Sequence, residues 1–173
     1  SQEWTGYYAK VEAHKNEKRM SGDPYLVHPV AVSLKIAALR LDPQTVSAAL
    51  LHDVVESGVT TKKLEGLFGE EIAFLVDGVT KVDRIHYRGV ERAVESIRKM
   101  FLALAEDIRV VIIKLADRLH NMQTLAILPP DDQKRIALET AEIYAPLAYR
   151  LGMQKLSGEL EDLAFPYLYP NEY

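Results

Sequence analysis

The glycines and prolines of this chain stand between stretches of helical periodicity and do not cluster at one boundary. In those stretches, apolar residues recur at the three- and four-residue spacing of helices that bury one face. From Ile108 to Leu125 there is no Gly or Pro, so the apolar run at 110–113 fits a long internal helix better than a short strand. We therefore predict an all-α fold of about eight helices, in one domain that spans residues 1–173.

The helix boundaries follow from local stop and start signals. Asp42-Pro43 reads as an N-cap followed by proline at the first helical position, and it opens a helix that Gly58 ends. Another helix starts after His28-Pro29. The remaining helices are expected at 3–16, 60–68, 70–79, after Gly89, and at 108–125, 130–150 and 155–165.

Composition excludes several classes of function. The 173 residues include no cysteine, which rules out thiolate metal sites and cysteine nucleophiles and favours a cytoplasmic location. The 21 Lys and Arg against 25 Asp and Glu give a net charge of −4, so we expect no direct binding of nucleic acid by this domain. No apolar stretch approaches the roughly 18 residues that span a membrane, and we expect no membrane contact.

The feature most indicative of chemistry is the pair His52-Asp53, which interrupts an apolar run on the predicted third helix. His28 precedes a proline at a helix start, and Asp117 interrupts the apolar run of the long internal helix. Two imidazoles and two carboxylates from three helices form a mixed donor set that suits Mn, Fe, Co, Ni or Zn. The residues alone do not choose among these metals, and a histidine satisfied within the core is the structural alternative for His52.

The segments around these four residues are more specific than the residues themselves. Those segments lie at 21–29, 48–56, 77–81 and 114–122, with further ones at 142–148 and 160–165. They resemble the N-terminal hydrolase domain of the RelA/SpoT-homologue family, which belongs to the HD superfamily of metal-dependent phosphohydrolases. The resemblance implies a compact HD-superfamily helical bundle. It also implies hydrolysis of the 3′-diphosphate of ppGpp and pppGpp to GDP or GTP and pyrophosphate, the alarmone turnover of the stringent response.

The resemblance also assigns roles to residues. It implies one divalent ion, Mn²⁺, as cofactor, a catalytic pair that acts on the attacking water, and a set of contacts to the nucleotide. The metal ligands are His28, His52, Asp53 and Asp117, the catalytic pair is Glu56 and Ser57, and the substrate-binding residues are Arg19, Ser21, Asn121 and Thr124. Glu56 follows His52 by four residues, which would place both on one helix face.

This chain departs from the family pattern at two positions. Ser57 stands where the family usually has Asp, and a hydroxyl does not act as a base near neutral pH. Met20 stands where a Lys is frequent. A basic rim around the substrate is expected from Lys18, Arg19 and Lys81 or Arg118. His120 is expected to be structural, whereas His14 and His86 have no expected role; Tyr144, Met100, Met122 and Phe101 are expected in the core.

Three alternatives stay open. The first is another HD-type nucleotide phosphohydrolase with a different leaving group. The second, motivated by Ser57, is a weak or inactive hydrolase that binds the alarmone as a regulatory module. The third is a helical interaction domain without a metal. The last residues, 168–173, stop where longer family members continue, so we expect a fragment whose parent chain carries a synthetase domain in cis and is also a GTP pyrophosphokinase.

Overall fold

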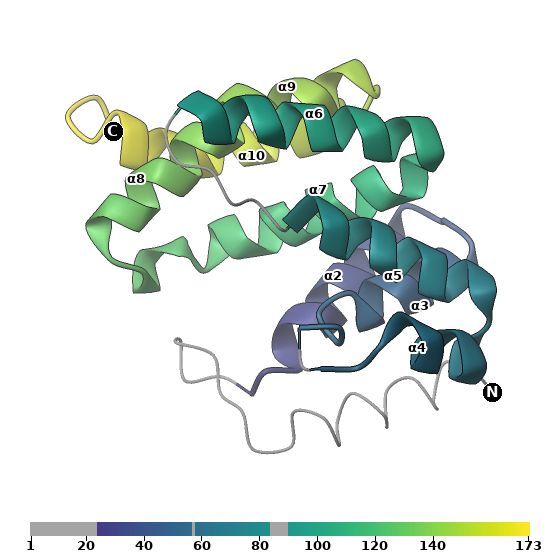
Figure 1. Ribbon diagram of the computed structural model, residues 1–173. Helices are drawn as coiled ribbons and strands as arrows, with labels where there is room; N and C mark the ends of the chain where they lie inside the picture. The colour runs from purple at the N-terminus through teal and green to yellow at the C-terminus, as the bar shows by residue number, and fades with distance from the viewer. Residues whose placement is uncertain (1–23, 57, 84–89) are drawn as a thin grey trace.

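The structure is a computed structural model that describes residues 24–56, 58–83 and 90–173, and every element in these ranges is helical (Figure 1). This confirms the all-α prediction. The helix expected at 3–16 lies outside the described residues. None of the described helices has the length and apolar character needed to cross a membrane.

The first group of helices consists of α2 (Val27–Ala38), α3 (Pro43–Leu51), α4 (Thr61–Phe68) and α5 (Glu70–Asp83). The predicted cap of α3 is confirmed, because the side chain of Asp42 accepts a hydrogen bond from the backbone N–H of Thr45. Thr60 caps α4 in the same way through the N–H of Lys63. Gly69 has a φ of 92°, and this left-handed backbone separates α4 from α5.

The second group comprises α6 (Val90–Glu106), α8 (Pro130–Glu139), the π-helical segment η2 (Thr140–Tyr144), α9 (Ala145–Arg150) and α10 (Gln154–Leu168). Between the two groups runs α7 (Ile108–Gln123), followed by the short 3₁₀ segment η1 (Leu125–Ile127). Helix α7 packs against α2, α3 and α5 on one side and against α6, η2 and α10 on the other (Figure 1). Any residue at the centre of α7 therefore lies where both groups meet.

The packing of α7 explains its apolar run. Val110, Val111 and Ile113 are buried, as the prediction of an internal helix required. Gly78 of α5 faces Val110 so closely that a Cβ at residue 78 would lie 2.7 Å from Cγ2 of Val110. Only glycine lets α5 and α7 approach this closely.

Three predicted boundaries were wrong. Helix α2 already begins at Val27 and so contains His28. Helix α3 ends at Leu51, seven residues before Gly58, and residues up to Glu56 form turns. The reason is local: Nδ1 of the His52 ring lies 2.6 Å from the carbonyl oxygen of Ala49, which a continuing helix would bond to the N–H of Asp53. The predicted helix 130–150 is interrupted by η2.

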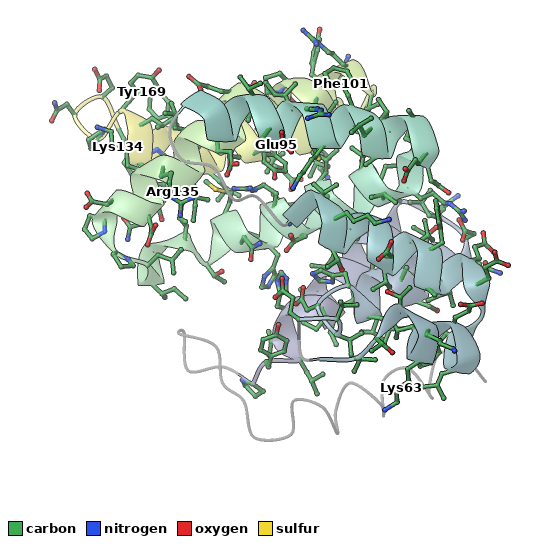
Figure 2. All side chains as sticks on the ribbon, in the orientation of Figure 1. Lys63, Glu95, Phe101, Lys134, Arg135 and Tyr169 are labelled. Carbon is green, nitrogen blue, oxygen red and sulfur yellow. The ribbon has the colours of Figure 1, made fainter. Side chains whose placement is uncertain are left out.

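Three of the four aromatic and methionine residues expected in the core are buried, and one is exposed. Tyr144, Met100 and Met122 are buried, as predicted. Phe101 is 52% exposed and extends outward from α6, so its prediction was wrong (Figure 2). The residue next to a buried position on an amphipathic helix points about 100° away from it, and Met100 takes the inward place.

Candidate metal centre

The structure brings the four predicted ligands together from three places in the fold. His28 comes from the first turn of α2, His52 and Asp53 from the turn after α3, and Asp117 from the middle of α7. Nε2 of His28 lies 3.0 Å from Oδ1 of Asp117 and 3.8 Å from Oδ2 of Asp53. One ligand atom each from His28, His52 and Asp53 lie within 4.8 Å of one another.

The turn after α3 is what allows the adjacent residues His52 and Asp53 to face one point. Nε2 of His52 lies 2.7 Å from Oδ1 of Asp53 and 3.8 Å from Oδ1 of Asp117. It is nevertheless a buried nitrogen that makes no hydrogen bond within the described part of the chain. The other ring nitrogen, Nδ1, points to the carbonyl oxygen of Ala49.

This arrangement fits a divalent metal ion. A metal-binding histidine typically donates its second N–H to a carbonyl, and this donation leaves the opposite nitrogen unprotonated and aimed at the metal. Nδ1 of His52 has that partner in Ala49, which leaves Nε2 as the nitrogen that could bind a metal. Leaving a buried polar atom without a hydrogen bond costs free energy, and a metal ion would remove this cost.

Two further side chains make hydrogen bonds to the candidate ligands. Nδ1 of His28 lies 2.9 Å from Nδ1 of His120, in agreement with the structural role expected for His120. The hydroxyl of Tyr25 donates to Oδ2 of Asp53 at 3.3 Å. These contacts fix the orientation of one imidazole and one carboxylate before any ion binds.

Asp117 is the most enclosed carboxylate of the centre. Its Oδ2 accepts from Nζ of Lys114 at 2.5 Å and its Oδ1 accepts from Nδ2 of Asn121 at 2.8 Å. Burial by itself would raise the pKa of Asp117, but Lys114 and the imidazoles of His28 and His52 hold it well below its ordinary value. Asp117 is therefore charged at neutral pH, as a ligand must be.

The charge of Asp117 acts in turn on His52. Burial would lower the pKa of His52, whereas the negative charges of Asp53 and Asp117 raise it to about 9. In the absence of metal, the centre therefore holds a proton on an imidazole between two carboxylates. The two carboxylates therefore favour a positive charge at this position.

The other predicted site residues have different outcomes. Glu56 lies in an exposed turn and shares no helix face with His52, so the predicted i, i+4 geometry was wrong. Asn121 touches a metal ligand, while Thr124 donates to the backbone carbonyl of His120 at 3.3 Å. Arg19, Ser21 and Ser57 lie outside the described residues, as do Lys18, Met20, His14 and His86.

Arg118 does not belong to a basic rim. Its guanidinium lies 3.9 Å above the Tyr144 ring and pairs with Glu139 at 3.1 Å, and its side chain is 12% exposed. Because residues 117 and 118 are about 100° apart around α7, one faces the centre and the other faces η2. Lys81 is exposed and pairs with Asp77 at 2.7 Å.

Sequence reasoning missed Lys114 and Tyr25 as neighbours of the ligands. The signal for Lys114 was its position three residues before Asp117 in one helix, which places both on one face. Tyr25 offered no comparable signal, because its contact with Asp53 joins residues 28 positions apart.

Comparisons with known proteins show the family and the fold. A family model described as HD domain matches residues 7–154. A solved structure of a metazoan orthologue of SpoT, described as hydrolysing ppGpp, has a TM-score of 0.74 and 25% identity, and the match covers 94% of this chain and 93% of that one. A Listeria monocytogenes structure with 23% identity and a TM-score of 0.62 shares the fold.

Curated relatives are more similar in sequence. A guanosine-3′,5′-bis(diphosphate) 3′-pyrophosphohydrolase of Vibrio cholerae is 53% identical over 96% of this chain. The bifunctional (p)ppGpp synthase/hydrolase SpoT of Escherichia coli is 51% identical over the same share, and a GTP pyrophosphokinase of Streptomyces coelicolor is 53% identical. This chain spans 24% of the length of the first two and 20% of the third.

Proposed function

This chain belongs to the HD domain family, and from that premise we propose that it hydrolyses the 3′-diphosphate of ppGpp and pppGpp. The observation that carries the proposal is the cluster of His28, His52, Asp53 and Asp117, in which Nε2 of His52 makes no hydrogen bond to any residue that the structure describes. Relatives at about half identity that are named for this reaction support the choice of substrate.

We propose that His28, His52, Asp53 and Asp117 hold one Mn²⁺ ion. The mixed nitrogen and oxygen donors support a divalent transition metal, and the resemblance to the RelA/SpoT-homologue family supports manganese among them. When bound, the ion polarises a phosphoryl oxygen of the 3′-diphosphate and offsets part of its negative charge.

The chain's own residues then supply the proton transfer and the nucleotide contacts. In our proposal, the Glu56 carboxylate takes a proton from the water that attacks the 3′-linked phosphorus. As the water oxygen bonds to that phosphorus, the bond between the phosphorus and the 3′ oxygen breaks and the 3′ oxygen takes up a proton, which releases pyrophosphate and leaves GDP or GTP. Ser57 follows this base in the sequence and completes the proposed catalytic pair, and the nucleotide contacts are assigned to Arg19, Ser21, Asn121 and Thr124.

The proposal extends to the protein in which these residues act. We propose that residues 1–173 are the hydrolase domain of a bifunctional protein whose synthetase domain lies in the same chain. The names of the Escherichia coli and Streptomyces coelicolor relatives support this, as does the small share of their length that is matched. We also propose a cytoplasmic location, on the ground that the chain has no cysteine and the substrate is a nucleotide.

The test is to incubate the purified chain with Mn²⁺ and ppGpp and to separate the products by chromatography. We expect GDP and pyrophosphate in equal amounts. Release of orthophosphate, or turnover of other nucleotides in preference to ppGpp, would point to a different HD-type phosphohydrolase. Binding of ppGpp without products would point to a regulatory module.

The metal assignment has its own test. We expect the variants His52→Ala and Asp53→Ala to lose the ion, as measured by elemental analysis after dialysis. The native chain should melt at a higher temperature with Mn²⁺ than with chelator, because an ion that binds only the folded state stabilises it. Full occupancy in either variant would refute the ligand set.

A further inference from the structure

Lys114 is a buried cation that takes no part in the ligand set. It lies on α7, three residues before Asp117, and its side chain is 7% exposed. Burying an ammonium group costs several kcal/mol unless it is paired with a negative charge. Lys114 has such a partner in Asp117, because its Nζ lies 2.5 Å from Oδ2 of that carboxylate.

The two oxygens of Asp117 point to different groups. Oδ2 faces the ammonium of Lys114, while Oδ1 faces Nε2 of His28 at 3.0 Å and Nε2 of His52 at 3.8 Å. Lys114 therefore contacts the side of the Asp117 carboxylate that faces away from His28 and His52, and its charge acts on the other ligands through that carboxylate. A charge at this position is only a few ångströms from any ion held by Oδ1.

We propose that Lys114 is a positioning residue that offsets the charge of Asp117, which weakens cation binding at this centre and strengthens anion binding to the loaded centre. A positive charge close to a divalent ion repels that ion, and the effect is large in a buried site because screening is weak. The same charge attracts a phosphate group that approaches the ion. The anion part rests on the proposed function, whose substrate and product are phosphate anions.

A purely orienting role would have the opposite effect on metal binding. If Lys114 served only to hold the Asp117 carboxylate in place, its loss would free the carboxylate and weaken metal affinity. If its charge matters as proposed, the loss of that charge tightens metal binding. The sign of one measured change therefore separates the two roles.

The experiment compares two neutral variants with a variant that retains the charge. Lys114→Gln keeps an N–H donor near Asp117, Lys114→Met keeps the chain length without a donor, and Lys114→Arg keeps the charge. The control is Lys35→Met, which removes a lysine that pairs with Glu159 at 3.3 Å on the surface. Each protein is titrated by calorimetry first with Mn²⁺ alone and then, once loaded, with inorganic phosphate.

For both neutral variants we expect Mn²⁺ affinity to rise and phosphate affinity to fall, each by at least about tenfold. Lys114→Arg and Lys35→Met should stay within about threefold of the native protein. Two neutral variants are included so that one can carry the test if the other fails to fold, which a thermal melt shows.

Weaker Mn²⁺ binding in the neutral variants would overturn the proposal in favour of orientation, and unchanged phosphate binding would overturn its anion part. Failure of the proposed function would be seen elsewhere, as absence of ppGpp turnover in the native protein with Mn²⁺. Both titrations remain readable in that case, because neither depends on turnover.

Discussion

The imidazole rings of His28 and His120 meet through their Nδ1 atoms, which lie 2.9 Å apart. One of the two atoms must donate and the other accept. If Nε2 of His28 binds a metal, that nitrogen carries no proton, so Nδ1 of His28 carries it and donates to His120. His120 thereby selects the ring state of His28 that can serve as a ligand.

We therefore expect His120→Ala to lower Mn²⁺ affinity by about tenfold or more, in the range known for partners of metal ligands. His120→Asn should retain most of the affinity, because an amide oxygen can accept the same hydrogen bond. Calorimetric titration measures both, with Gln123→Ala on the exposed side of α7 as the control. Equal affinity in His120→Ala and the native protein would contradict the argument.

A second prediction concerns the contact of α5 with α7. Gly78→Ala places a methyl group 2.7 Å from Cγ2 of Val110, so the helices must move apart. We expect a loss of about 1–3 kcal/mol in the free energy of unfolding. Gly66→Ala in α4 meets open space and is the matched control, expected to stabilise by about 0.5–1 kcal/mol. Urea denaturation of both variants decides the matter; a neutral Gly78→Ala would show that α5 and α7 can separate without cost.

The ion pair of Asp107 with Arg109 predicts a pH dependence of stability. Hydrogen bonds from Arg109 lower the pKa of Asp107, and its Oδ2 lies 2.8 Å from Nη2 of Arg109. A carboxyl with a lowered pKa stabilises the fold above its unfolded pKa of about 3.9, and this contribution disappears as the pH falls through the folded value. Asp107→Asn should therefore cost about 1 kcal/mol at pH 7 and progressively less below about pH 4.

Melting curves of Asp107→Asn and the native chain between acid and neutral pH test this. The control is Asp132→Asn, which removes an exposed pair with Arg135 at 2.7 Å and is expected to change stability by a few tenths of a kcal/mol at most. A constant difference between Asp107→Asn and the native chain across the pH range would be incompatible with the charge argument.

The catalytic pair gives a further prediction, which depends on the proposed function. Glu56→Gln is nearly isosteric but cannot take a proton, so we expect metal and nucleotide binding to persist while turnover falls by about 10²–10⁴-fold. Ser57→Asp restores the carboxylate usual in the family, and we expect kcat to rise at saturating substrate, with a higher KM from added negative charge.

Steady-state kinetics on both variants give the answer. Unchanged turnover in Glu56→Gln would remove Glu56 from the reaction. A slower Ser57→Asp would show that the serine is an adaptation of this protein.

Some properties of this protein were determined by the sequence alone, because they depend on neighbours along the chain. The cap at Asp42 and the long helix from Ile108 each follow from residues within one or two turns. The four candidate ligands were also identifiable, since the segments around them are specific. Residue type and local pattern suffice for such features.

Tertiary structure decided what depends on contacts between distant segments. It brought the turn after α3 beside the first turn of α2, so that Asp53 lies near His28. It gave each oxygen of Asp117 its own hydrogen-bond donor, Lys114 for Oδ2 and Asn121 for Oδ1. It also directed Arg118 toward Glu139 and Tyr144. Helical periodicity states which residues share a face, but the packing of α7 between two groups of helices determines what each face meets.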